Sequence, residues 1–243
     1  MKASRPGGLG PSRLRHQQNQ MRHRRAGYIV FLRERKAKMR AMKARKFTRR
    51  PGRPRTFDTD KALDRAVRVF WRKGYEGASL SALTKAMGIN RPSLYAAFGD
   101  KKDLFRKALD RYAEGPARYL REALSQPTAR AVVERLLHAA ACRQADRHGP
   151  RGCLLVQGAL ACGDAAESAR RELNARRAAA ETAIRRRLER AKREGDLPAG
   201  SHPAHLARYL ATIMQGMAVQ AAGGATRGEL RRVVETALRG WPG

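Results

Sequence analysis

One short segment of this sequence carries side chains suited to contacting a nucleic acid. Arg91, Ser93 and Tyr95 alternate in the residues that follow Asn90. A guanidinium forms paired hydrogen bonds with a guanine edge, and hydroxyl groups bond to phosphate oxygens. The spacing therefore suggests base and phosphate contacts, provided that the segment is a helix with these side chains on its outer face.

A second candidate for chemistry is Cys153, which begins an apolar run directly after Gly152 and two residues after Arg151. Amide dipoles at a helix start and a neighbouring guanidinium both favour the reactive thiolate. Such a thiol could react with oxidants or electrophiles by forming a sulfenic acid, an adduct or a bridge to Cys142 or Cys162. The alternative is a small hydrophobic residue buried in the core.

Patterns for catalysis and for metal binding are missing from the sequence. It has no G-x-S-x-G, Walker loop, H-E-x-x-H or dinucleotide fingerprint. Its three cysteines form no C-x-x-C pair, and the only close histidine pair is His202 and His205. We expect no enzyme activity, no metal site and no cofactor.

Cysteine use and apolar run lengths bear on the compartment. Three cysteines are an odd number, and no secretory signal is evident, which favours a reducing compartment, the cytoplasm. The apolar stretch Ala26–Leu32 has seven residues, far fewer than the roughly 20 that span a bilayer. We expect no membrane insertion.

The charge of the 243-residue chain is unusually positive, with 53 Lys+Arg against 21 Asp+Glu and a formal net charge of +32. Such a charge indicates a polyanionic partner. The excess is concentrated in residues 1–55, which hold 19 Lys+Arg and one acidic residue. Because this segment is also poor in apolar residues, we expect a basic N-terminal extension that is disordered in isolation.

Two interpretations of the extension remain open. It could follow DNA phosphates, with Arg53 and Arg55 entering the adjacent minor groove. Alternatively, residues 1–41 could be upstream sequence that is not translated, with the protein starting at Met39 or Met42.

Hydrophobic periodicity predicts helices throughout the rest of the chain. A first helix over residues 59–73 should end at Gly74. Ser79 then stands at the N-cap of a short second helix, which Gly88 closes. Asp100 should cap a fourth helix.

The third helix, residues 91–98, is the one that carries the polar side chains. Asn90 can cap it by accepting from the amide of Ser93, and Pro92 occupies the first turn. Leu94 and Phe98 face inward, which leaves Arg91, Ser93 and Tyr95 outside. Two short helices joined by a tight turn form a helix-turn-helix; the alternative is a plain three-helix core module.

The stretch Phe70–Phe105, FWRKGYEGASLSALTKAMGINRPSLYAAFGDKKDLF, resembles the DNA-binding domain of the tetracycline-repressor (TetR) family of bacterial transcriptional regulators. The marks of the resemblance are Gly74-Tyr75, Ser79, Gly88-Ile89-Asn90, Leu94-Tyr95, Phe98 and Lys101. It implies an all-α fold, with a three-helix DNA-binding domain in residues 56–103 and a helical ligand-sensing and dimerisation domain in residues 104–243.

The resemblance also implies roles for individual residues. Ser79, Tyr95 and Lys101 would hold phosphates, while Arg91, Pro92 and Ser93 would approach base edges. Ala96 and Ala97 depart from the family pattern, because many members place an aromatic residue and a histidine there. The small side chains of Ala96 and Ala97 remove a possible polar contact at that end of the helix.

The pattern of apolar and charged residues in the C-terminal part predicts a dimer surface and a helix with a solvated face. Apolar stripes at Leu206–Ala221 and Leu230–Trp241 suit a four-helix dimer bundle, which is where the family dimerises. The competing interpretation is packing within the same chain. The triplet Arg185-Arg186-Arg187 on a long helix over residues 165–194 is most simply a solvated face.

A ligand pocket between these helices is implied by the resemblance, and any of its candidate residues could equally be core. The candidates are Tyr112, Tyr119, His138, Cys153, Gln157, Met214 and Met217.

The leading hypothesis is a homodimeric, ligand- or redox-responsive regulator of transcription, a repressor acting on a palindromic operator in double-stranded DNA. Its inducer would be a small molecule, an oxidant or an electrophile. The alternative is a nucleoid-like or RNA-binding structural protein in which the basic extension supplies the affinity.

Overall fold

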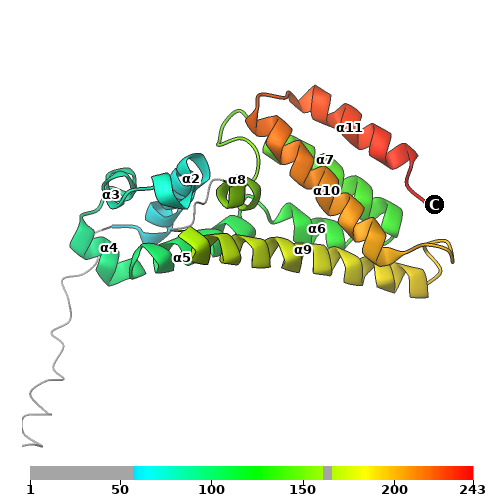
Figure 1. The fold of residues 1–243 in the computed structure, drawn as a ribbon, viewed down its shortest axis with the longest axis horizontal. Helices are drawn as coiled ribbons and strands as arrows, with labels where there is room; N and C mark the ends of the chain where they lie inside the picture. The colour runs from blue at the N-terminus through cyan, green and yellow to red at the C-terminus, as the bar shows by residue number, and fades with distance from the viewer. Residues whose placement is uncertain (1–56, 161–165, 243) are drawn as a thin grey trace, which may run out of the picture. The chain divides into compact units, whose positions relative to one another are not determined.

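The structure is a computed structural model, which describes residues 57–160 and 166–242. The predicted N-terminal extension, with Arg53 and Arg55, lies outside the described residues, as does Cys162. The described part is all-helical, as the sequence predicts. Its helices, labelled as in Figure 1, are α2 (Thr59–Gly77), α3 (Leu80–Met87), α4 (Arg91–Phe98), α5 (Lys101–Glu114), α6 (Tyr119–Leu124), α7 (Ala129–Gln144), α8 (Leu154–Leu160), α9 (Glu167–Arg193), α10 (Pro203–Ala222) and α11 (Arg227–Arg239).

The caps expected from the sequence form at the starts of α3, α4 and α5. Ser79 accepts a hydrogen bond from the amide of Ala82, and Asp100 accepts one from the amide of Asp103. The first helix differs in one respect. Gly74 takes a non-helical conformation, φ 67° and ψ −178°, but a further turn follows as far as Gly77. Gly74 therefore kinks α2 where it was expected to end it.

Two apolar clusters hold the helices together. The first unites α2 to α5 with α8 and the start of α9, around Phe70, Leu94 and Phe105. The second unites α6, α7, α10 and α11 with the rest of α9, around Leu136, Leu188 and Leu210. α9 therefore contributes to both clusters, and in Figure 1 it runs beneath most of the other helices.

The last helix packs mainly on α7. Val234 on α11 is fully buried and belongs to the second cluster. Its neighbour Val233 is 44% exposed. The apolar stripe of α11 is therefore largely buried within the chain, and only residues at its edge, such as Val233, are exposed to contact another molecule.

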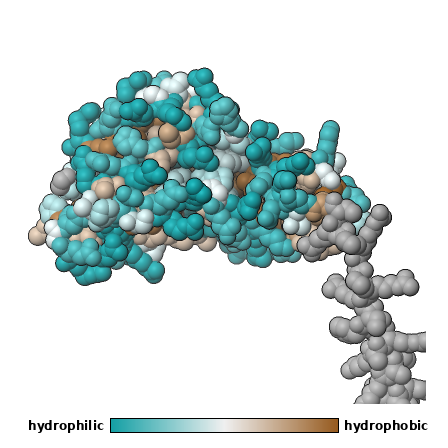
Figure 2. Space-filling view, turned by 180° about the vertical axis from the view of Figure 1, so that it is seen from behind, coloured by the Kyte–Doolittle hydropathy of each residue, from teal (hydrophilic) through white to brown (hydrophobic). Residues whose placement is uncertain are grey.

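The surface in Figure 2 is mostly hydrophilic, as the high content of charged residues suggests. On the face shown in Figure 2, hydrophilic side chains predominate and hydrophobic ones appear in small areas between them. None of the helices in residues 57–160 and 166–242 is both long and apolar enough to span a bilayer.

Arg187 corrects one expectation. Its side chain is only 6% exposed, whereas Arg185 and Arg186 are exposed. Its Nη2 donates to the carbonyl oxygens of Gln126 and Pro127, each at 2.9 Å. Burial lowers the pKa of Arg187, and the nearby charge of Arg190 adds to this effect. One member of the triplet thus ties α9 to the loop between α6 and α7.

We predict that Arg187→Ala destabilises the protein, because two backbone carbonyls lose a charged donor. The free energy of unfolding should fall by about 1–3 kcal/mol. Arg186→Ala is the matched control and should change it by less than about 0.5 kcal/mol. Urea unfolding at fixed protein concentration measures both, and equal effects would contradict a structural role for Arg187.

Candidate DNA-binding surface and regulatory cavity

α4 is held at both ends. The side-chain oxygen of Asn90 accepts from the amide of Ser93 at 2.9 Å. At the other end, Lys107 Nζ donates to the carbonyl of Phe98 at 3.0 Å, which supplies positive charge at a helix C-terminus. Leu94 and Phe98 are buried between these ends. The sequence predicted the first cap but not the contribution of Lys107, which comes from the next helix.

The outer face of α4 carries the predicted contact residues. Arg91 and Pro92 are exposed, Tyr95 is 47% exposed and Ser93 is half-buried. Within the described residues, Arg91 forms no ion pair with a carboxylate. The helix start therefore presents a guanidinium and hydroxyl groups together, the donor types that suit a base edge and adjacent phosphates.

The turn before α4 depends on Gly88, whose φ of 70° lies in the left-handed region. The carbonyl of Met87 in this turn accepts from Arg65 Nη1 at 3.5 Å. Arg65 is a positioning residue that the sequence did not reveal, because it lies on α2.

Lys101 has partners of its own. Its Nζ lies 3.4 Å from the carbonyl oxygen of Glu76 and 4.6 Å from the ring centroid of Tyr75. Burial lowers the pKa of Lys101, and the charge of Glu76 opposes this. Lys101 therefore fastens the start of α5 to the end of α2, a role additional to the phosphate contact expected from the resemblance.

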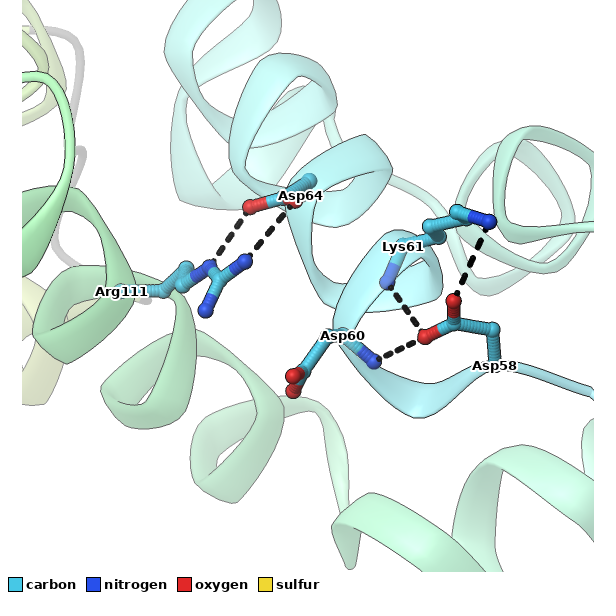
Figure 3. Close-up of polar contacts among 5 residues, drawn as sticks. All are labelled: Asp58, Asp60, Lys61, Asp64 and Arg111. Atoms are coloured by element: carbon cyan, nitrogen blue, oxygen red, sulfur yellow. Dashed lines mark hydrogen bonds and ion pairs between the residues drawn. The ribbon is translucent and has the colours of Figure 1, made fainter.

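α2 is tied to the C-terminal half of α5 by a bidentate ion pair. Arg111 Nε and Nη2 lie 2.7 and 3.0 Å from the two carboxylate oxygens of Asp64 (Figure 3). Figure 3 also shows Asp58 accepting from the amides of Asp60 and Lys61 at the start of α2. The helices that surround α4 are thus fixed to each other by polar contacts as well as by the core.

A cavity of about 90 Å³ is lined by residues of α5 to α10 and of the segments that join them. Four of the seven predicted pocket residues line it: Tyr112, Tyr119, Cys153 and Met214. The other lining residues were not predicted: Ala117, Leu120, Gln144, Leu155, Val156, Arg177, Ala180, Glu181, Ile184, Ala211 and Gln215.

Three predicted residues do not line the cavity. His138 is exposed on α7, and Met217 is 2% exposed within the apolar core. Gln157 is half-buried beside Gly152, where a Cβ on the glycine would lie 2.7 Å from its Nε2. Gly152 has φ 78°, so both its conformation and its surroundings require glycine.

The thiol of Cys153 faces a tyrosine. Tyr112 Oη donates to Cys153 Sγ at 3.4 Å. Burial raises the pKa of Tyr112 and of Tyr119, and the neighbouring Cys153 adds to the rise in both. Both tyrosines therefore remain protonated phenols at neutral pH.

Arg151 does not accompany the thiol as the sequence suggested. Its Nη2 donates to the carbonyl oxygen of Ala225, between α10 and α11. The described hydrogen bond to the thiol comes from Tyr112 instead. The thiol of Cys153 thus has a phenol beside it, and the guanidinium of Arg151 is bound elsewhere.

Family models match two parts of the chain. Residues 62–108 match the family described as bacterial regulatory proteins, tetR family, and residues 129–237 match the tetracyclin repressor-like C-terminal domain. The first match contains α3 and α4, and the second contains most of the cavity-lining helices.

Individual relatives cover most of the chain. The HTH-type transcriptional repressor ComR of Escherichia coli K12 is 33% identical over 193 residues, 79% of this chain and 92% of ComR. The solved structure of a cysteine mutant of the TetR family regulator CifR, complexed with 26-bp double-strand operator DNA, is 47% identical, with a TM-score of 0.75. That match covers 78% of this chain and 100% of CifR.

BdcR, a second HTH-type transcriptional repressor of E. coli K12, is 39% identical over 119 residues, 48% of this chain and 60% of BdcR. All three of these relatives are regulators of transcription. With the helix-turn-helix and the C-terminal helices both matched, the chain belongs to the TetR family of DNA-binding transcriptional regulators.

Proposed function

We propose that this protein is a homodimeric repressor that binds a palindromic operator through α4 and is released when a small molecule, an oxidant or an electrophile reaches the cavity. The observation that carries the proposal is α4, capped at both ends and turning Arg91 and Tyr95 outward. The similarity to CifR, solved with operator DNA, and to the repressors ComR and BdcR supports it.

Base recognition is assigned to Arg91. We predict that Arg91→Ala costs about 1–3 kcal/mol of operator affinity and relaxes preference at one position of each half-site. Lys101→Ala should weaken binding to all sequences alike. It should also reduce the slope of log K against log salt by about one, because one phosphate contact is lost.

Selection of bound sequences from a random DNA pool, with titrations at several salt concentrations, measures both effects. An unchanged motif for Arg91→Ala would contradict its assignment. Footprints of unlimited length would instead favour the structural nucleic-acid-binding alternative, which the charge of residues 1–55 motivates.

Dimerisation is assigned to the groove between α10 and α11. Its lining includes Tyr209, Ile213, Val233 and Thr236. Tyr209 and Val233 are 43% and 44% exposed, so the groove presents apolar side chains at the surface. Two-fold pairing through these helices would place two copies of α4 on successive half-sites.

We predict that Val233→Asp yields a folded monomer with greatly weakened operator binding, because an unpaired charge in an interface is costly. Val234→Asp should instead unfold the chain, since Val234 is fully buried in its own core. Sedimentation and circular dichroism separate the two results. A folded Val233→Asp dimer would refute this interface.

Sensing is assigned to the cavity, where a ligand could act in two ways. A reactive ligand could modify Cys153, whose sulfur lies beside Tyr112 Oη. A non-covalent ligand could occupy the same space. We predict that Cys153→Ser retains operator binding and loses release by peroxide or an electrophile. DNA release by gel shift measures this, with Cys142→Ser as the matched thiol control. Equal release in wild type and Cys153→Ser would leave only the non-covalent route.

A further inference from the structure

Gln144 is the last residue of α7 and is only 3% exposed on the cavity wall. Its Nε2 donates to the carbonyl oxygen of Met214 on α10 at 3.1 Å. Because that carbonyl can only accept, the bond fixes which end of the amide is nitrogen. The other end, Oε1, has no hydrogen-bond partner among the described residues.

A buried acceptor without a donor is costly, and pockets commonly use a few such groups to orient a ligand. Beside Gln144, the hydroxyl of Tyr119 stays protonated, because burial raises its pKa while contact with the Gln144 side chain only partly opposes this. A hydroxyl group on a ligand can donate to Gln144 Oε1 and accept from Tyr119.

The charges along the cavity argue against an ionic ligand. Its two charged lining residues, Arg177 and Glu181, are opposite in sign. Each is bound to an outer partner: Arg177 Nη2 lies 2.6 Å from Asn174 Oδ1, and Glu181 Oε1 lies 2.7 Å from Arg208 Nε. The remaining lining is mostly apolar.

We propose that the cavity selects a small, uncharged molecule with an apolar body and one hydroxyl group, and that Gln144 is the residue that selects the hydroxyl. This rests on the proposed sensing function and names its ligand class. The volume of about 90 Å³ limits the buried part to a few non-hydrogen atoms, since a cavity of roughly 150 Å³ accommodates benzene.

Propan-2-ol and acetone test the proposal, because both have four non-hydrogen atoms and only propan-2-ol donates a hydrogen bond. Saturation-transfer NMR titration of the full chain should show propan-2-ol binding about tenfold more tightly. Gln144→Leu should reduce propan-2-ol affinity to that of acetone and leave acetone unchanged. Gln144→Met serves as the second variant if leucine disturbs folding, which thermal unfolding would reveal.

Ala180→Leu, which fills the cavity, should abolish binding of both probes and so locate them. Equal affinity of wild type for the two probes, or a preference for propan-2-ol that survives in the Gln144 variants, would overturn the proposal. Operator affinity at saturating propan-2-ol is a separate readout. Retained operator binding there would count against the sensing function while leaving the assignment of Gln144 intact.

Discussion

An eight-residue helix does not hold its own shape in water, and the base recognition that we propose depends on one such helix, α4. α4 is maintained by the burial of Leu94 and Phe98 and by caps from Asn90 and Lys107. Its outer residues can be polar because its inner residues satisfy the packing requirement. The same division explains why α4 carries only a weak apolar stripe and still forms.

The contacts that fix α4 also extend towards the cavity. Tyr112, whose hydroxyl meets Cys153, packs edge-on against Trp71 of α2 with ring centroids 4.9 Å apart. The residue before Tyr112, Arg111, binds Asp64 of α2. α5 therefore contacts the cavity through Tyr112, and it contacts α2 through both Tyr112 and Arg111. A displacement of Tyr112 cannot occur without repacking against the helix that supports the DNA-binding turn.

Local signals made much of this structure predictable. The caps at Ser79, Asn90 and Asp100 and the left-handed Gly88 each act within three or four residues, so the sequence alone identifies them. Lys107, Arg65 and the partner of Arg151 were missed because each contact joins two separate helices or loops. The burial of Val234 in its own chain was missed for a similar reason. Periodicity identifies an apolar face, but it does not say whether that face packs on its own chain or on a second copy.

Gln144 and Arg187 share a signal that the sequence does contain. Each interrupts an apolar stripe: Gln144 lies four residues after Ala140, and Arg187 lies between Ile184 and Leu188. Burial of such a group is tolerated only with hydrogen bonds, so the break in the stripe marks a buried polar contact. The partners are 70 residues away for Gln144 and about 60 for Arg187, which puts them beyond any local pattern. Both side chains keep buried polar atoms without a hydrogen-bond partner in the described part of the chain, Arg187 at Nε and Nη1 and Gln144 at Oε1. Only Gln144 lines the cavity around Cys153, and this position is why we propose a ligand contact for Gln144 and a tie between α9 and the preceding loop for Arg187.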